Sequence, residues 1–453
     1  MYSILKTRAK ERKIKLYNSV PFLFLTVLAV AGGLISPGIL KSRANYVNAD
    51  IAWLIVSSCL VFLMTPGLSF FYGGMVNRKN VISTILQSFI ATGLVGLLWV
   101  VFGFSLAFGK SFHGLIGDPT QFFFFRNVIG GEPWPTAPTI PLLLFALFQM
   151  KFAVISPAIV VGAVAEKVQF KAFLLFMVLF TIFIYAPIAH WTWNPEGFLF
   201  QFGVLDFAGG TVVHISSGCA ALAGALFLRR RRGIGSCIMR PANIPFVVLG
   251  TSLLWFGWFG FNAGSAFAAD SLAVIAFTTT ITATSAAGLT WIFLDGVRGK
   301  KPSAMGFCIG AIVGMVAITP AAGFVDVPQS LCIGFIAAFV SNIFINSRIK
   351  HKLNDTLDVF ACHGLGGIIG MLLTGVFATT LINDAGADGW LYGNPSLFLR
   401  QALAMLLVVA YSFVAGWGIF KLVDLIYPLS VSDEEERVGL DISQHDEKYA
   451  EVV

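Results

Sequence analysis

Long apolar runs alternate with short polar segments along most of the chain. After residue 50, eleven runs are long enough to cross a bilayer as helices, which takes about 20 residues each. They lie near residues 51–73, 80–104, 139–165, 172–190, 208–228, 243–263, 270–294, 303–322, 327–347, 358–381 and 397–424. Because lipid admits only helices or closed barrels, and these runs are too long for barrel strands, the pattern predicts an all-α integral membrane protein with eleven transmembrane helices.

Composition supports this interpretation. Of the 453 residues, 57% are hydrophobic and only 12% are charged, whereas soluble domains carry about 25% charged residues. The net charge of +7 is spread over short loops between apolar runs, which argues against nucleic-acid binding. The six cysteines show no CxxC spacing, so we expect neither a zinc site nor a disulfide framework.

The first 44 residues differ from the rest. Six Lys or Arg residues between Lys6 and Lys15 precede an apolar stretch, and Ser42 and Ala44 follow it with the small side chains of a cleavage site. We predict a signal peptide over residues 1–44 that is removed from the mature protein. The alternative is an uncleaved first span, which would place the N-terminus in the cytoplasm.

Loop charges predict the orientation of the remaining chain. Basic groups such as Arg78 with Lys79, and Arg298 with Lys300, fall on one side of the predicted spans. The other side has mainly Lys110 and Arg126. The positive-inside bias places the N-terminus of the transport domain, residues 45–424, outside the plasma (cell inner) membrane, and the charged tail, residues 425–453, in the cytoplasm. Spans one to five and six to ten then have opposite orientation, which permits an inverted five-helix repeat followed by a final helix.

Two similar segments carry ionisable groups into apolar runs. "DFAGGTVVHISSG" contains Asp206 and His214, and "DVFACHGLGGIIG" contains Asp358 and His363. We interpret Asp206 as a helix N-cap that also holds negative charge near an outer pore mouth, and Asp358 as a mainly structural counterpart. Ionisable groups inside a membrane are expensive and usually face a cavity or each other.

The two histidines have alternative interpretations. They are either separate core residues, each bonded to a carbonyl, or an imidazole pair that lines one pore. Imidazole titrates nearest neutrality of all side chains, so a pair would suit a substrate that carries a proton. A metal site is a poorer account, because no third ligand sits at ligand spacing on either helix.

Aromatic side chains supply a second group of candidates. Phe148 and Phe152 are four residues apart and share a helix face. Trp258, Phe261 and Ser265 form another single stripe, and Trp193 lies in a predicted outer loop. Packing explains any single ring, but rings beside a hydroxyl would attract a small cation by about 0.5–2 kcal/mol.

Six motifs together resemble the ammonium transporter family, specifically its bacterial ammonium transporter branch. They are "TPGLSFFYGGMVNRKNV", "VGAVAEKVQF", "LDFAGGTVVHI", "GWFGFNAGSA", "VAITPAAGF" and "DVFACHGLGGIIG", in that order. The resemblance covers residues 50 to 445. It implies an eleven-span homotrimer in the membrane lipid, with a pore for ammonium, ammonia or methylammonium through each subunit, no cofactor, no enzymatic activity and a tail that in some members meets a PII signalling protein.

The resemblance also implies a role for each candidate residue. Substrate-binding residues at and near an outer recruitment site would be Trp193, Phe148, Phe152, Ser265, Asp206, Trp258 and Thr319. Phe152 and Phe261 would stack as a gate, and His214 and His363 would be the twin pore histidines. This chain departs from the family at Lys151, between the two rings of one span, and in the tail sequence "HDEKYA".

Three other functions remain open at this point. A Rh-type channel for ammonia or carbon dioxide resembles a twelve-span version of the fold. An ammonium sensor would signal through the tail with little flux. A bis-histidine haem or metal electron carrier belongs to a different class, and the purified protein would be coloured or contain metal.

Overall fold

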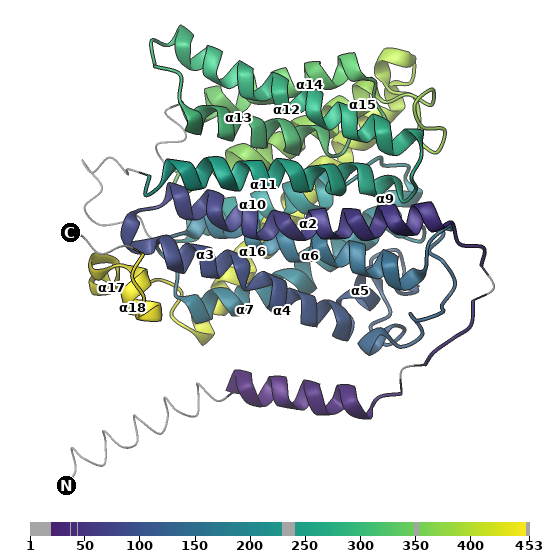
Figure 1. Cartoon of the computed structure of the whole chain (residues 1–453), viewed down its shortest axis with the longest axis horizontal. Helices are drawn as coiled ribbons and strands as arrows, with labels where there is room; N and C mark the ends of the chain where they lie inside the picture. The colour runs from purple at the N-terminus through teal and green to yellow at the C-terminus, as the bar shows by residue number, and fades with distance from the viewer. Residues whose placement is uncertain (1–19, 37, 43, 229–240, 348–352, 450–453) are drawn as a thin grey trace.

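The computed structural model describes residues 20–36, 38–42, 44–228, 241–347 and 353–449. In Figure 1 the long helices lie side by side with roughly parallel axes. Within the described ranges the only strands are β1 (Ser111–Phe112) and β2 (Ile116–Gly117), a short antiparallel pair. The all-helical prediction is therefore confirmed.

The helices follow one another with short connections, and η marks a 3-10 or π-helical turn. The first part of the chain forms α2 (Asn48–Met75), η1 (Arg78–Asn80), α3 (Val81–Phe89), α4 (Ala91–Leu98), η2 (Trp99–Gly103), α5 (Phe104–Phe108), η3 (Phe123–Phe125), α6 (Leu142–Val164), α7 (Phe170–Phe180), η4 (Thr181–Tyr185), α8 (Ala186–Trp193), α9 (Phe198–Gln201), η5 (Gly210–Ile215) and α10 (Ser216–Phe227). The second part forms α11 (Ile244–Ala263), η6 (Gly264–Ala266), α12 (Ser271–Val297), α13 (Ala304–Ile318), α14 (Val327–Ile345), η8 (Phe360–Gly364), α15 (Leu365–Phe377), η9 (Trp390–Tyr392), α16 (Pro395–Ile426), α17 (Asp433–Val438) and α18 (Leu440–His445).

Within the residues that the structure describes, ten helical segments are long and apolar enough to cross a membrane, which makes this a multi-pass membrane protein. Every one of the eleven predicted runs contains a helix, but the eighth is α13, with only 15 residues. At 1.5 Å per residue α13 extends over about 22 Å, less than the roughly 30 Å of a bilayer core. The eleven-span count and the inverted repeat therefore stay predictions.

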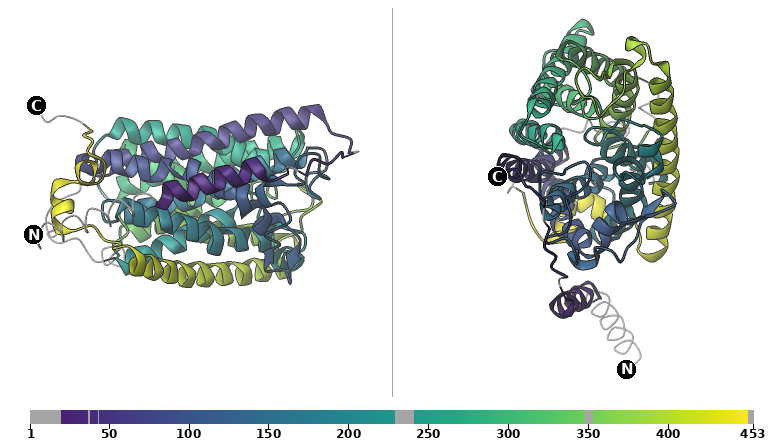
Figure 2. Two further views of the ribbon diagram at one scale, coloured as in Figure 1. Left: turned by 90° about the horizontal axis from the view of Figure 1, so that it is seen from below. Right: turned by 90° about the vertical axis from the view of Figure 1, so that its right-hand side faces the viewer.

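A helix over Val20–Leu34 precedes the bundle and lies apart from it, as Figures 1 and 2 show. Its apolar side chains are exposed: Phe22 by 70% and Leu34 by 82% of their surface. The helix coincides with the apolar part of the predicted signal peptide, whose basic part, Lys6 to Lys15, lies outside the described residues. Cleavage after this segment stays a prediction.

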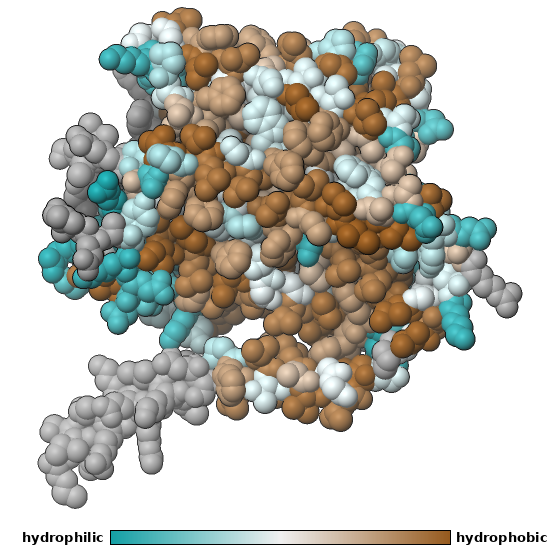
Figure 3. Space-filling view, in the orientation of Figure 1, coloured by the Kyte–Doolittle hydropathy of each residue, from teal (hydrophilic) through white to brown (hydrophobic). Residues whose placement is uncertain are grey.

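The bundle surface matches a lipid environment. Large apolar side chains lie in the open on its long helices, including Val297, Leu425 and Phe293. In Figure 3 hydrophobic residues fill the middle of the visible face, and hydrophilic residues gather toward its two ends. A surface with this distribution is stable in hydrocarbon and would aggregate in water.

Glycines let α2 and α11 pack in close contact. A Cβ atom added to Gly257 would lie 2.3 Å from Cγ of Met64, and one added to Gly260 would lie 2.6 Å from Cβ of Leu60. Neither distance is compatible with a side chain, so the helices can approach this closely only because both positions are glycine. Small residues at such contacts are what allow membrane helices to pack this closely.

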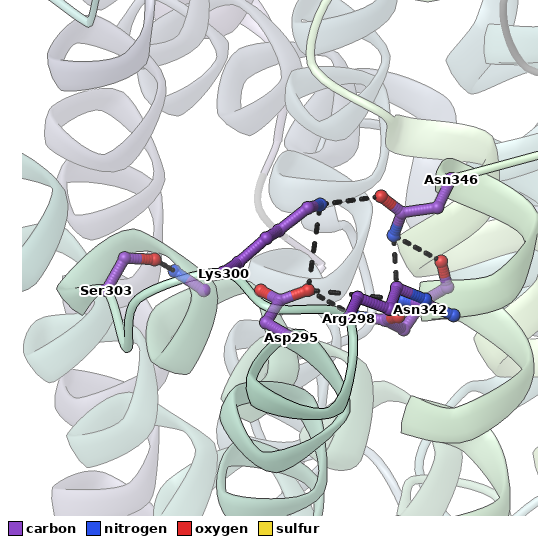
Figure 4. Close-up of polar contacts among 7 residues, drawn as sticks. Asp295, Arg298, Lys300, Ser303, Asn342 and Asn346 are labelled. Atoms are coloured by element: carbon purple, nitrogen blue, oxygen red, sulfur yellow. Dashed lines mark hydrogen bonds and ion pairs between the residues drawn. The ribbon is translucent and has the colours of Figure 1, made fainter.

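The two ends of the bundle differ, and we name them by what they carry. The tail end carries α17 and α18, and the opposite end carries α5 and α9 (Figure 1). At the tail end Asp295 of α12 lies 4.0 Å from Arg298 and 3.8 Å from Lys300, and Lys300 donates a hydrogen bond of 2.8 Å to Asn346 of α14 (Figure 4). Arg298 also donates to Asn342, so polar contacts tie α12 to α14.

The tail folds back onto the bundle through α17 and α18. The Lys79 ammonium group donates to the backbone carbonyl oxygens of Glu436, at 2.6 Å, and Arg437, at 3.0 Å. A carboxylate oxygen of Asp441 accepts a hydrogen bond of 2.8 Å from the backbone amide of Ser83, at the start of α3. The tail is thus bound to the segment that joins the first two spans.

Candidate functional site

Two histidines from distant parts of the chain meet inside the bundle. His214 and His363 are both buried, and their Nδ1 atoms lie 3.3 Å apart. The ring centroids are 5.4 Å apart, with 30° between the planes. A hydrogen bond between two Nδ1 atoms needs one hydrogen, so two neutral rings must adopt opposite tautomers. One ring then presents an accepting Nε2 atom and the other a donating Nε2–H group.

Both histidines sit on π-helical turns. His214 belongs to η5 and His363 to η8, and each turn leads directly into a regular α-helix. A π turn holds an extra residue compared with an α turn, and such turns occur frequently at functional sites. The extra residue rotates the imidazoles relative to the helices that follow. The apolar pattern of the sequence contains no sign of these turns.

Asp206 holds the start of the first turn. Its carboxylate accepts hydrogen bonds from the backbone amides of Gly209, at 2.8 Å, Gly210, at 2.6 Å, and Thr211, at 2.7 Å. The Thr211 hydroxyl donates to the same carboxylate. These four hydrogen bonds, all donated by groups of the protein, satisfy the carboxylate of Asp206. They confirm the interpretation that Asp206 caps the free amides at this helix start.

The second turn has an equivalent cap. The carboxylate of Asp355 accepts the backbone amides of Val359, at 3.1 Å, and Phe360, at 2.9 Å. Asp355 precedes His363 by eight residues, just as Asp206 precedes His214 by eight. The eight-residue spacing in the sequence is the signal that identifies Asp355, and a structural role for Asp358 stays a prediction.

Glycines bring the two turns together. A Cβ atom added to Gly218 of α10 would lie 2.2 Å from the backbone nitrogen of Gly364 in η8. The backbones therefore cross without any side chain between them. This close approach lies next to His363 and allows the two imidazoles to reach each other.

A small, largely apolar cavity surrounds the histidine pair. It is lined by Met64, Leu68, Ile155, Ile159, His214, Leu254, Trp258, Phe261, Ile312 and His363. The space open to the centre of a water-sized molecule is about 10 Å³, which accommodates roughly one such molecule. The Nε2 atom of His214 is buried here without a hydrogen-bond partner. Within the described ranges, no three His, Cys, Asp or Glu side chains lie close enough together to hold a metal ion.

Aromatic rings close one side of this cavity. Phe152 and Phe261 are stacked, with centroids 4.2 Å apart and 29° between the planes. Trp258 stacks on His214 at 5.3 Å and 15°. Its indole nitrogen donates a hydrogen bond of 3.0 Å to the Thr319 hydroxyl, which fixes the ring orientation. The structure thus brings these four predicted residues together around His214.

The remaining predicted residues lie on the other side of the Phe152 ring, toward the opposite end of the bundle. Trp193 meets Phe152 edge-on at 5.7 Å, and its indole nitrogen donates to the Asp206 carbonyl at 3.0 Å. Phe148 meets Phe152 at 5.0 Å. The Ser265 hydroxyl donates to the Phe261 carbonyl at 2.8 Å, which leaves its oxygen lone pairs to accept from another donor.

Sequence reasoning missed Phe267 in this group. Its ring packs on Phe148 at 5.8 Å, and its backbone is left-handed, with φ +58°. A non-glycine residue in this conformation is uncommon and is held in place by its surroundings. The sequence has no turn motif that would have predicted it.

Comparisons with known proteins agree with this geometry. A sequence profile described as the Ammonium Transporter Family matches residues 52–450. The chain is 46% identical to "Ammonium transporter" of Bacillus subtilis and 43% identical to "Ammonium transporter Amt1" of Archaeoglobus fulgidus, in each case over 88% of this chain and 98% of the relative.

Solved structures give the same answer. The crystal structure of Saccharomyces cerevisiae Mep2 superimposes with a TM-score of 0.81 at 33% identity, covering 86% of this chain and 89% of that one. A structure titled "Sensor Amt Protein" superimposes with a TM-score of 0.79 at 31% identity, covering 88% and 98%. By sequence and by structure, the chain belongs to the ammonium transporter family.

Proposed function

We propose that this protein carries ammonium across the membrane by recruiting the ion, removing a proton and passing ammonia along His214 and His363. The observation that carries the proposal is the histidine pair in a cavity that holds about one small molecule. The relatives named ammonium transporters support the choice of substrate.

The energetics favour deprotonation over passage of the ion. Moving a bare ammonium ion into hydrocarbon costs on the order of tens of kcal/mol by Born solvation. Aromatic rings return only about 0.5–2 kcal/mol. A buried amine loses its proton more easily than one in water, so the neutral form is the one that passes the apolar section.

The tautomers of the histidine pair suit ammonia. Ammonia can donate a hydrogen to the accepting Nε2 atom and accept one from the donating Nε2–H group. Potassium has no proton to lose and finds only apolar side chains and two imidazoles in the cavity. The pair therefore both lowers the barrier for ammonia and discriminates against metal cations.

The residues beyond the stacked rings form the recruitment site. Trp193 and Phe148 would offer ring faces to the cation, and the free lone pairs of Ser265 would accept its hydrogen. Phe152 and Phe261 would open as a gate by rotating their rings. Asp206 acts indirectly, because its four hydrogen bonds to the protein position the turn that carries His214.

The setting of the transporter is part of the same proposal. The tail end faces the cytoplasm of a cell whose plasma membrane holds the protein as a homotrimer, with eleven spans arranged as an inverted repeat and a last helix. Asp206 and Asp355, each eight residues before a pore histidine, support that repeat. Residues 1–44 would be removed, and a PII-type protein would bind at the tail end.

The test compares ammonium and potassium currents of pure protein in liposomes on a solid-supported membrane. The double variant with His214→Ala and His363→Ala should lose ammonium-selective current, while the exposed His113→Ala control keeps it. Ammonium-selective current that persists in the double variant would refute the role of the histidines. Wild-type protein that passes potassium as well as ammonium would refute the whole proposal.

A sensor function is the second candidate. The similarity to a structure titled "Sensor Amt Protein" favours it, as does the extensive contact between the tail and the bundle. A sensor should bind ammonium with little flux. Liposome uptake close to background, together with ammonium-dependent protection of the tail from protease, would favour this candidate over transport.

A further inference from the structure

Lys151 lies in the middle of α6, between two rings of the proposed recruitment site, and neither the fold nor the proposed function accounts for it. It is nine residues from the start of the helix, which is about 14 Å along the helix axis and well inside a bilayer core. The side chain is half-buried. Placing a charged group at this depth costs free energy, which indicates that the group has a function.

Lys151 does not enter the recruitment site. Its ammonium nitrogen lies 5.4 Å from the centroid of the Phe62 ring of α2, in cation–π contact. On a helical wheel it is about a quarter turn from the face shared by Phe148 and Phe152, since each residue advances the helix by about 100°. Lys151 therefore stands beside that face, against a neighbouring helix.

The charge of Lys151 has no counterion nearby. In the part of the chain that the structure describes, its ammonium group has no carboxylate within ion-pair distance, and it lies over the ring of Phe62. The carboxylate of Asp206 is engaged by four donors of its own turn. An uncompensated charge in a poorly polarisable environment acts over a long range.

We infer that Lys151 weakens the binding of cations at the recruitment site by electrostatic repulsion, and so sets the affinity of this protein for ammonium. The inference rests on the proposed function. The ammonium group and the recruited ion would be on the order of 10 Å apart, because a helix with its side chains is about 10 Å across. At an effective dielectric constant of about 20 to 40, repulsion at that distance changes a binding constant about fourfold to sixteenfold.

The repulsion has a specific kinetic signature. It opposes the arrival of an ion but not the passage of a neutral molecule, so it should raise the half-saturating concentration and leave the maximal rate nearly unchanged. It should act alike on ammonium and methylammonium, because both carry one positive charge. A merely structural lysine would instead alter stability and maximal rate together.

The experiment measures currents of full-length protein in liposomes as a function of ammonium and of methylammonium concentration. Lys151→Met, which keeps an unbranched side chain, should lower the half-saturating concentration of both ions about fourfold to sixteenfold. Lys151→Arg keeps the charge and should retain the wild-type value. Lys421→Met, which removes an exposed lysine near the end of α16, should also behave like wild type.

The outcomes of this experiment distinguish the inference about Lys151 from the proposed function. Equal half-saturation in wild type, Lys151→Met and Lys151→Arg would refute the inference and leave the proposed function standing. A lower value in both Lys151 variants would also refute it, because the arginine retains the charge. Wild-type protein without ammonium current would remove the proposed function and the inference with it. The thermal unfolding temperature of each variant verifies that the currents being compared come from folded protein.

Discussion

Side-chain hydrogen bonds hold distant segments together both around the histidine pair and around the docked tail. The two regions differ in how far water reaches them. His214 and Asp206 are buried in the bundle, and Asp206 is satisfied entirely by its own turn. In the tail, Glu434 and Arg437 are exposed and pair only with each other. Hydrogen bonds without competing water are costly to break, whereas exposed ones exchange with water. The geometry of the histidine pair should therefore be rigid and the tail contact adjustable.

The largest effect is expected when Asp206, which caps the turn that carries His214, is replaced. Asp206→Ala leaves three backbone amides and one hydroxyl in the buried turn without an acceptor, at about 1–3 kcal/mol for each buried group that stays unsatisfied. We expect unfolding to become easier by at least about 3 kcal/mol, and ammonium current to disappear. Asp270→Ala, at the N-cap of α12, removes the acceptor of the Ala273 amide alone and should cost about 1 kcal/mol. Thermal unfolding in detergent measures both, and an equal or reversed order would contradict the comparison.

A somewhat smaller effect is expected where the two histidine turns cross. Gly218→Ala places a Cβ atom against the backbone of η8 and should destabilise the protein by about 1–3 kcal/mol through overpacking. It should also separate the imidazoles and reduce ammonium current. Gly93→Ala is the matched control, because nothing lies within 4 Å of the added atom. If both variants carried normal current, close contact of the turns would not matter for transport.

The tail contact should respond more weakly. Asp441→Ala removes the acceptor of the Ser83 amide and should weaken tail docking by about 1–2 kcal/mol, which is typical of a lost helix cap. Limited proteolysis should cut the tail faster, while the unfolding temperature of the bundle stays unchanged. A large drop in that temperature would show that the tail belongs to the rigid part of the molecule.

The smallest effect concerns pH at the tail. His445 packs edge-on against Phe170, and burial lowers the pKa of its imidazole below the ordinary 6.5. The free tail therefore binds a proton more readily than the docked tail, so docking should weaken as pH falls through about 6.5. Burial raises the pKa of Asp441 above 3.8, which favours docking on acidification, but in a lower pH range.

Protease sensitivity of the tail should accordingly rise by a small factor between pH 7.5 and pH 6. Because His445 is only partly buried, solvent screens the effect and we expect no more than a few-fold change. His445→Gln should abolish this part of the pH dependence. Sensitivity that falls over the same interval would contradict the assignment to His445.

Apolar runs predicted the helices well, because lipid imposes length and composition on each span. The pairing of His214 with His363 could also be predicted, since similar segments surround both residues. Similarity between the two motifs did not identify the residue that caps the second turn, although the eight-residue spacing between Asp355 and His363 was present in the sequence. The π turns, the left-handed Phe267 and the contact of Lys79 with the tail depend on packing between segments far apart in the sequence, which no local pattern encodes.

The size of the cavity beside the histidines restricts what can travel through it. A chamber for one small guest cannot hold two waters in contact, so a continuous water wire, along which protons would hop, is interrupted there. Under the proposed function, guests would also pass one at a time and in order. Labelled and unlabelled molecules arriving from opposite membrane faces would then obstruct each other, and isotope exchange would slow when both sides are filled.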